Sequence, residues 1–142
     1  MSESHPPQKP RRVIIVEDNA LVAKFFRMAL ERVGGYSCTV TEDVPEMLKE
    51  IEAGEVDLVL LDVSLTNAQW EGQLVNGVEL CQILKKKSPR RLPVLLATAH
   101  TMSGDRERFL EASGADGYLE KPVYDSAALV EKARQLIDKV SF

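Results

Sequence analysis

The sequence predicts an α/β fold: a doubly wound, five-stranded parallel sheet with five helices. Short continuous apolar runs, which suit strands buried on both faces, recur along the chain. Between them lie segments whose apolar residues repeat with the period of a helix. Strict alternation of strand and helix favours a parallel sheet with right-handed crossovers and helices on both faces. The length of 142 residues suits one such domain.

The first half of the chain contains two strand–helix units and a third strand. The apolar run 13–16 predicts the first strand, and the helical stripe 21–33 follows it until Gly34 and Gly35 end the helix. A second strand is expected at 36–41 and a second helix at 45–53, which Gly54 ends. The third strand is the run 58–61.

The second half continues the alternation. Helices are expected at 78–87 and 104–112, and a strand is expected between them at 94–97. A short last strand at 116–120 precedes an amphipathic helix at 126–140, for which Asp125 is the candidate N-cap. Residues 1–11 are polar and rich in proline, so we expect a flexible tail, containing His5, before a domain at 12–142.

Composition and charge exclude several classes of protein. With 44% hydrophobic and 28% charged residues the chain is not disordered, and its net charge of −4 provides no global attraction to nucleic acid or anionic lipid. The basic run 85–91 is interpreted as a solvated helix end. No apolar run approaches the length of a membrane span, so we expect a cytoplasmic protein. Cys38 and Cys81 have neither redox-motif nor zinc-ligand spacing and are expected to be packing residues.

Reactive side chains follow the predicted strands. Glu17 and Asp18 come directly after the first strand, Asp62 after the third and Thr98 after the fourth, and Lys121 lies close to the end of the last. Because the carboxyl ends of parallel strands meet at one edge of a sheet, these five residues should share one cleft. Three carboxylates so close together call for a hard divalent cation with oxygen ligands, and Mg²⁺ fits because it also binds phosphate oxygens.

This set of residues suits phosphoryl transfer. A carboxylate can attack phosphorus to form an aspartyl phosphate, and the central position of Asp62 makes it the candidate nucleophile. Thr98 could donate a hydrogen bond to a phosphoryl oxygen. Lys121 could pair first with Asp62 and then with the phosphate. Taken singly, each residue has an ordinary structural explanation, such as a helix cap or a turn, but together and in this order they favour the chemical one.

Four motifs resemble the response regulator receiver domains of two-component signalling over residues 12–140: Val-Glu-Asp-Asn at 16–19, Leu-Leu-Asp at 60–62, Ala-Thr-Ala at 97–99 and Gly-Ala-Asp-Gly-Tyr-Leu-Glu-Lys-Pro at 114–122. The resemblance implies a flavodoxin-like receiver fold with strand order 2-1-3-4-5. It also implies that Asp18 ligates Mg²⁺ directly, that Glu17 acts mainly through water, and that the backbone carbonyl of Ser64 completes the protein ligands. The Lys121–Pro122 bond would be cis.

The same resemblance implies how a signal would arrive and leave. A sensor histidine kinase or a histidine phosphotransfer protein would phosphorylate Asp62. Thr98 would then move toward the phosphate, and Tyr118, if it is more than a packing residue, would move inward. The face formed by the fourth helix, the last strand and the last helix would change its protein partner, and a homodimer through this face remains open. His100, two residues after Thr98, either influences how water reaches the phosphoryl group or is an idle surface residue.

The sequence also departs from the family pattern. Leu65-Thr66 replaces the familiar Met-Pro after the nucleophile, and the glycine that normally follows soon afterwards appears only at Gly77. The stretch 66–76 is longer than the roughly 2–6 residues of an ordinary strand-to-helix loop, which indicates a local insertion beside the site. Trp70, within it, either packs locally or anchors a partner.

Three functions are therefore compared. The first is a receiver that we expect to stand alone, since the chain ends at Phe142 directly after the last helix. Such a protein is a phosphoacceptor in signalling and not an enzyme in the usual sense. The second is a receiver-like interaction module that does not use phosphorylation because the insertion blocks the site. The third is a phosphatase of the haloacid dehalogenase type. That class needs a second acid where Ser64 stands, and its further metal-binding acids follow the lysine instead of preceding the nucleophile.

Overall fold

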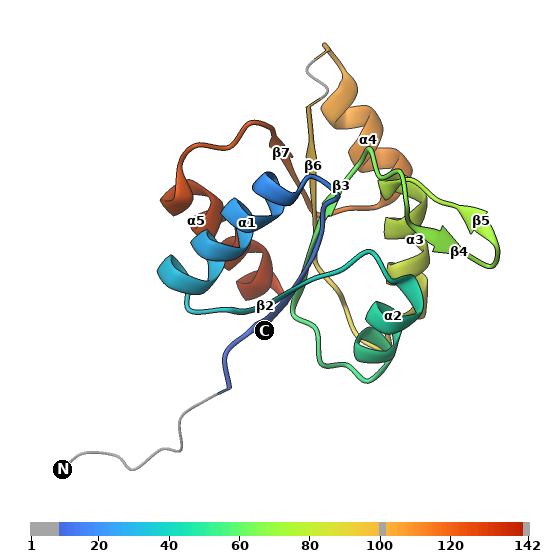
Figure 1. The fold of residues 1–142 in the computed structure, drawn as a ribbon, viewed down its shortest axis with the longest axis horizontal. Coiled ribbons are helices and arrows are strands. Elements are labelled where there is room, and N and C mark those ends of the chain that lie inside the picture. The colour runs from blue at the N-terminus through green and yellow to red at the C-terminus, as the bar shows by residue number, and fades with distance from the viewer. Residues whose placement is uncertain (1–8, 100–101, 141–142) are drawn as a thin grey trace.

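The central sheet of the computed structural model has five parallel strands (Figure 1): β1 (Arg12–Val16), β2 (Ser37–Val40), β3 (Leu58–Asp62), β6 (Val94–Thr98) and β7 (Gly117–Glu120). Their order is β2-β1-β3-β6-β7, which is the predicted order 2-1-3-4-5 when these strands are counted along the chain. The structure describes residues 9–99 and 102–140. Most of the expected tail, with His5, and also His100 lie outside the described residues.

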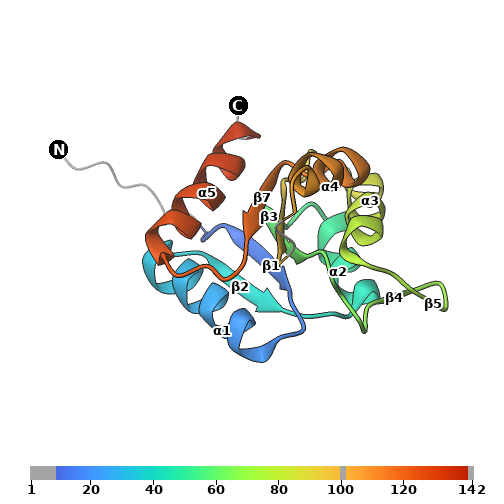
Figure 2. The same cartoon turned by 90° about the horizontal axis from the view of Figure 1, so that it is seen from above.

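Helices cover both faces of this sheet, as the alternation predicted (Figure 2). The helices α1 (Ala20–Met28) and α5 (Ser126–Lys139) lie on one face, and α2 (Val44–Glu52), α3 (Gly77–Lys87) and α4 (Asp105–Ser113) lie on the other. Side chains alternate along β1: Val13 and Ile15 pack toward α1 and α5, whereas Ile14 and Val16 pack toward the opposite layer. β1 is therefore fixed by apolar contacts on both sides, and β3 and β6 are likewise buried at every position.

The helix ends match the chemistry of their sequences. The expected N-cap Asp125 accepts a hydrogen bond from the backbone N–H of Ala128 at 3.1 Å. Asn76 and Glu79 form a capping box at the start of α3. The predicted helix 21–33 consists of α1 followed by a π-helical segment, η1 (Ala29–Val33). None of the helices in the described ranges is long and apolar enough to cross a membrane.

The basic run 85–91, which begins in the last turn of α3, has structural partners. Lys85 Nζ lies 2.6 Å from Asp116 Oδ2 and donates to the carbonyl oxygen of Leu92 at 3.0 Å. Arg90 pairs with Asp57 at 2.7 Å. The interpretation of the run 85–91 as a helix end is confirmed for Lys85 to Lys87, which form the last turn of α3. Lys85 and Arg90 are held in ion pairs and are not simply solvated.

Both cysteines are buried among apolar side chains, as expected for packing residues. Burial raises the pKa of each thiol to about 11, so neither is a nucleophile near neutral pH.

The insertion after β3 is a small hairpin that the sequence did not predict as strands. It pairs β4 (Gln69–Trp70) with β5 (Gln73–Leu74) around a turn in which Glu71 and Gly72 both have positive φ. Figure 1 shows the hairpin projecting beside α3. Trp70 is half-buried against the core, and Lys87 Nζ lies 6.0 Å from its ring centroid. Local packing therefore accounts for Trp70.

Gly77 closes the insertion onto the end of β3. Its backbone N–H donates to the carbonyl oxygen of Val63 at 2.9 Å. A Cβ atom at this position would lie 2.1 Å from the carbonyl oxygen of Asp62 and 2.7 Å from Val63 Cα. The close approach of two backbones, and not a special φ, requires glycine here. The two ends of the insertion thus meet beside Asp62, and the extra residues bulge outward.

We expect Gly77→Ala to destabilise the fold by about 2–3 kcal/mol, because the added methyl group forces the chain after Asp62 away from α3. Urea unfolding measures this loss. Gly54→Ala is the control, since a Cβ there meets nothing within 4 Å and only the positive φ is strained, which costs about 1 kcal/mol. Equal losses in the two variants would show that the contact with Asp62 is not the constraint.

Candidate functional site

The predicted site residues meet at the carboxyl edge of the sheet. Asp62 is the last residue of β3 and pairs in register with Ala97, so Thr98 lies one step further along the neighbouring strand. Glu17 and Asp18 follow β1, which pairs with the other side of β3. The topology therefore places the side chains of three adjacent strands around Asp62.

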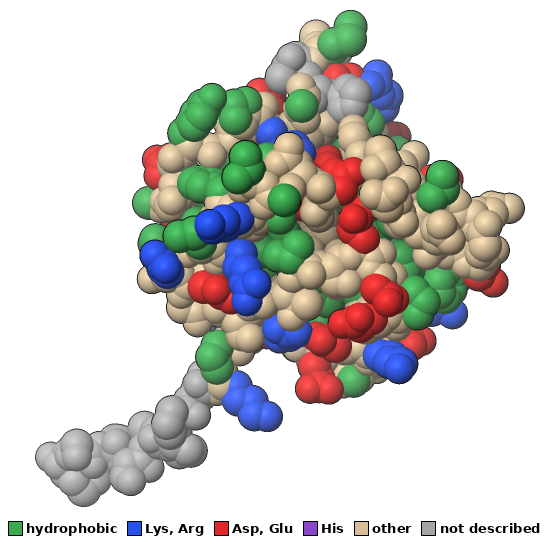
Figure 3. Space-filling view, in the orientation of Figure 1, with side chains coloured by type: hydrophobic (Ala, Val, Ile, Leu, Met, Phe, Trp, Pro, Cys, Tyr) green, Lys and Arg blue, Asp and Glu red, His purple; other side chains and the backbone are tan. Residues whose placement is uncertain are grey.

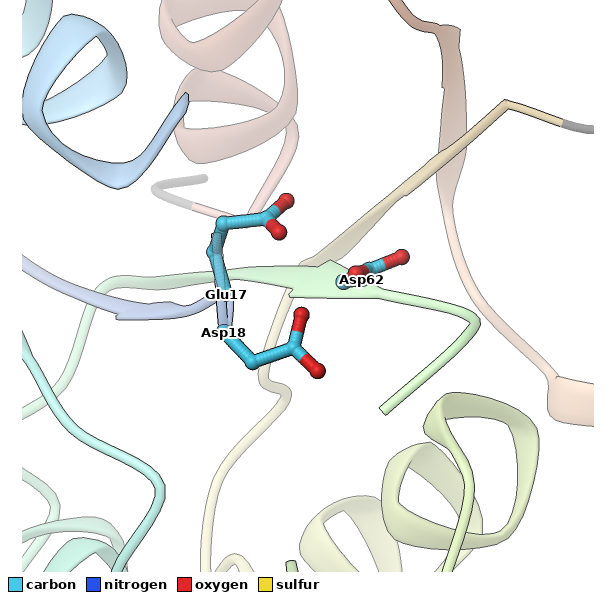
Figure 4. A group of neighbouring side chains, drawn as sticks. All are labelled: Glu17, Asp18 and Asp62. Carbon is cyan, nitrogen blue, oxygen red and sulfur yellow. The ribbon is translucent and has the colours of Figure 1, made fainter. Parts of the chain in front are cut away.

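Three carboxylates form the centre of the site. Glu17, Asp18 and Asp62 each contribute an oxygen to a group whose atoms all lie within 4.8 Å of one another. Figure 4 shows Glu17 and Asp18 reaching from the end of β1 toward Asp62 on β3. Glu17 and Asp62 are each only 4% exposed, whereas Asp18 is accessible to solvent. Figure 3 shows acidic side chains gathered along the middle of this face of the molecule.

Lys121 supplies the positive charge at this centre. Its Nζ lies 2.9 Å from Glu17 Oε1 and 3.4 Å from Asp62 Oδ2, so it bridges two carboxylates and is closer to Glu17 than to the expected partner Asp62. The Lys121–Pro122 bond is cis, as the resemblance implied, and the backbone N–H of Lys121 donates to the carbonyl oxygen of Thr98 at 2.8 Å.

The pKa values of this pair reflect the competition between burial and charge. Burial raises the pKa of Glu17 above its ordinary value, and the hydrogen bond from Lys121 offsets only part of the rise. Burial alone would lower the pKa of Lys121, but the hydrogen bond to Glu17 and the charge of Asp62 outweigh it and raise that pKa. Lys121 is therefore fully charged near neutral pH.

Each of the three carboxylates also accepts a hydrogen bond from a nearby loop. The backbone N–H of Asn19 donates to Glu17 Oε2 at 3.1 Å, and that of Ser64 donates to Asp62 Oδ1 at 3.0 Å. The hydroxyl of Thr66 donates to Asp18 Oδ2 at 2.7 Å. The carboxylates are thus oriented by donors that lie two or three residues after a strand end, or in the insertion.

Sequence reasoning missed a fourth carboxylate, Glu42. Burial and the negative charges of Asp18 and Asp62 raise the pKa of Glu42, which places it beside this group. Its Oε2 is buried and has no hydrogen-bond partner within the described ranges. The position of Glu42 in the sequence could have revealed it, because Glu42 follows β2 by two residues. The rule that the ends of parallel strands meet at one edge of the sheet applies to β2 as well.

Thr98 and Tyr118 line the next part of the sheet edge. Thr98 is fully buried at the end of β6. Tyr118 on β7 is buried too, and its ring stacks on Phe109 of α4 with centroids 6.5 Å apart. Burial raises the pKa of Tyr118 above its usual range. The tyrosine ring therefore already occupies an inward position in this structure.

The donor set fits a magnesium ion. Three clustered carboxylates against one ammonium leave excess negative charge, and the buried oxygen of Glu42 adds to it. All the available donors are hard oxygens, which Mg²⁺ and Ca²⁺ prefer and which soft metals do not.

Comparison with known proteins gave consistent matches. The response regulator receiver domain family matches residues 13–134. The polar-differentiation response regulator DivK of Brucella anthropi is 36% identical over 115 residues, covering 80% of this chain and 86% of DivK.

Two solved structures extend the comparison. A CheY-like receiver domain protein of Methanospirillum hungatei JF-1 superposes with a TM-score of 0.73 at 26% identity, covering 92% of this chain and 96% of the other. The receiver domain of the sensor histidine kinase PA1611 of Pseudomonas aeruginosa PAO1, with magnesium coordinated in its active site cleft, gives 0.72 at 26% identity, covering 91% and 98%.

We expect Lys121→Met to lower the free energy of unfolding by about 2–3 kcal/mol in the presence of EDTA, because Glu17 and Asp62 would face each other without their shared cation. Methionine keeps the apolar stem of the lysine. The control is Lys86→Met on the exposed side of α3, which should change stability by less than about 0.5 kcal/mol. If both variants unfold at the same urea concentration, the bridge contributes nothing to the fold.

Proposed function

This chain belongs to the response regulator receiver domain family of two-component signalling, and from that premise we propose that it accepts a phosphoryl group on Asp62 and signals by phosphorylation-dependent binding of a protein. One observation carries the proposal. Asp62 ends the central strand β3, between the acids that follow β1 and Thr98 on β6, and it lies within the acidic group and 3.4 Å from Lys121. Phosphoryl transfer requires positive charge near the oxygens of the transferred group, which Lys121 and a Mg²⁺ ion held by the acidic group would supply around Asp62.

In the proposed reaction a carboxylate oxygen of Asp62 attacks the phosphorus of a phosphohistidine. The new O–P bond forms as the N–P bond breaks, and the electron pair remains on the imidazole nitrogen of the donor. The hydrogen bond from the N–H of Ser64 to Oδ1 orients the carboxylate for attack. Lys121, held by Glu17, neutralises charge on the transferred group.

The proposed magnesium ligands are Asp18, Asp62 and the backbone carbonyl of Ser64, with Glu17 acting through water. A bound Mg²⁺ would supply electrostatic stabilisation of the phosphoryl oxygens. Glu17 divides its two oxygens between Lys121 and the N–H of Asn19, which suits an indirect role better than direct ligation. Asp18 faces solvent and is the carboxylate most accessible to an incoming hydrated ion.

Signal output is proposed to use Thr98 and Tyr118. Thr98 would donate its hydroxyl to a phosphoryl oxygen on Asp62, since the two residues end neighbouring strands. Because Tyr118 is already packed on Phe109, phosphorylation would stabilise this inward arrangement instead of creating it. The face formed by α4, β7 and α5 is the proposed site of the downstream partner, and of a homodimer if one forms.

The phosphodonor is proposed to dock beside Lys121. A pocket of about 400 Å³ there is lined mostly by apolar residues, namely Leu21, Val22, Phe25, Phe26, Ala99, Lys121, Pro122 and Val123. Leu21 is 80% exposed at the edge of the pocket. Since Lys121 lines this pocket and also touches Asp62, a helix of a histidine kinase or phosphotransfer protein seated there would bring its phosphohistidine to the site. The proposed location is the cytoplasm, where such a donor would meet this protein.

The alternative, an interaction module that does not use phosphorylation, has one observation in its favour: Asp62 is only 4% exposed. The insertion does not account for this burial, because it closes at Gly77 and projects beside α3. We therefore favour the phosphorylated receiver, and the first test below separates the two. Catalysis is limited in this proposal to the protein's own phosphorylation and dephosphorylation.

Incubation with acetyl phosphate and Mg²⁺ should add one acid-stable, base-labile phosphoryl group, detected by intact-protein mass spectrometry. Asp62→Asn should abolish it, because the amide is not a nucleophile. Asp43→Asn is the control, as it removes a nearby carboxylate but leaves an equally good N-cap for α2. Labelling that persists in Asp62→Asn would rule out Asp62 as the phosphoryl acceptor. If the wild-type protein is not labelled at all, the result supports the interaction module.

Leu21→Ser should slow phosphoryl transfer from a phosphorylated histidine phosphotransfer protein by about tenfold, while leaving labelling by acetyl phosphate unchanged. The substitution removes an apolar contact with the phosphotransfer protein but leaves the residues around Asp62 unchanged. Leu74→Ser on the hairpin is the matched control, since Leu74 is 65% exposed and lies outside the pocket. Equal slowing in both variants, or loss of labelling by the small donor, would argue against docking at Leu21.

A further inference from the structure

The insertion is bonded to the acidic group through Thr66. The Thr66 hydroxyl donates to Asp18 Oδ2 at 2.7 Å, across 48 positions of sequence. Among the described residues, Thr66 is the one hydrogen-bond donor to the Asp18 carboxylate. Glu17 and Asp62 are held by the backbone N–H groups of Asn19 and Ser64, which any residue except proline can supply. Lys121 also contacts Glu17 and Asp62, but these two keep a backbone donor in any case, whereas the hydrogen bond to Asp18 depends entirely on the side chain of Thr66.

We propose that Thr66 is a positioning residue that orients Asp18 for the cation and thereby sets the magnesium affinity of the site. The inference rests on the proposed function, in which Asp18 is a metal ligand. The hydrogen bond uses one oxygen of the carboxylate and leaves the other for the ion. A carboxylate so fixed loses less rotamer freedom on binding, which is how partners behind the ligands tune metal sites.

The structure around Thr66 keeps its hydroxyl in place. Leu65 and Ala68, on either side, are buried in the core, and the backbone N–H of Val75 donates to the carbonyl oxygen of Ala68 at 2.9 Å. Threonine is also stiff at χ1. The base of the hairpin is therefore a fixed support for the donor, although Thr66 itself is exposed.

Thr66 stands at the position where the family motif has a proline. A proline here, as in the family motif that the sequence lacks, has no group that could donate to Asp18. Replacing Met-Pro by Leu65-Thr66 thus exchanges a stiff turn for a hydrogen-bond donor. The hairpin is in this sense part of the metal site and not an appendage beside it.

The test is the dissociation constant of Mg²⁺, measured by isothermal titration calorimetry and by the fluorescence of Trp70, which is the only tryptophan in the sequence. Thr66→Val keeps the shape of the side chain and removes the donor, so the dissociation constant should rise about tenfold. Thr66→Ser restores the donor and should stay within about twofold of the wild type. Asn67→Ala, its exposed neighbour, should leave the constant unchanged.

Two further measurements separate the possible outcomes. In EDTA the urea midpoint of Thr66→Val should equal that of the wild type, which excludes a general loss of structure. Asp18→Ala tests the premise. If Asp18→Ala loses magnesium binding but Thr66→Val binds as tightly as the wild type, the role of Thr66 is overturned and the proposed function stands. If Asp18→Ala binds magnesium normally, Asp18 is not a ligand, and both proposals for this residue fail.

Discussion

The concentration of negative charge around Asp62 is the constraint on which the rest of the structure depends. Glu17, Asp18 and Asp62 lie within one small group, Glu42 stands beside it, and Lys121 is the cation that bridges Glu17 and Asp62. Such a group opposes folding, because burial of like charges is costly unless each one is paired or hydrogen-bonded. The stability that offsets this cost comes from the central strands β1, β3 and β6, whose apolar side chains are buried on both faces of the sheet.

The topology of the sheet determines where the site residues meet. A parallel sheet brings the carboxyl ends of its strands to one edge, so short loops suffice to place side chains from β1, β3 and β6 around one point. The approach of Gly77 to the backbone of Asp62 then fixes the loop that carries Ser64. The insertion leaves this contact intact because its own strands pair with each other, and so the fold accommodates extra residues next to Asp62.

The sequence was sufficient to predict the five strands, the five helices, their order and the meeting of the site residues, because buried strands and amphipathic helices have distinct periods and strand ends have a fixed location. It was not sufficient for the hairpin, since Gln69–Trp70 and Gln73–Leu74 are too short for a period of two to be visible. Glu42 was overlooked because it resembles an ordinary acid before a helix. That Lys121 lies closer to Glu17 than to Asp62 depends on ångström differences in side-chain geometry, which no pattern of residue types encodes.

The carboxylates are oriented by two kinds of hydrogen-bond donor, backbone N–H groups and the hydroxyl of Thr66. Amino-acid substitutions affect these two kinds of donor differently. Backbone donors such as the N–H groups of Asn19 and Ser64 persist through most substitutions, so they preserve the orientation of Glu17 and Asp62. A side-chain donor such as Thr66 can be gained or lost by one substitution without disturbing the sheet. Under the proposed function, a change in the loop after β3 would therefore alter metal affinity while Asp62, the proposed nucleophile, and Lys121 stay fixed. An insertion anchored at this loop is a place where one receiver can differ from another without altering the contacts of Asp62 with Ser64 and Lys121.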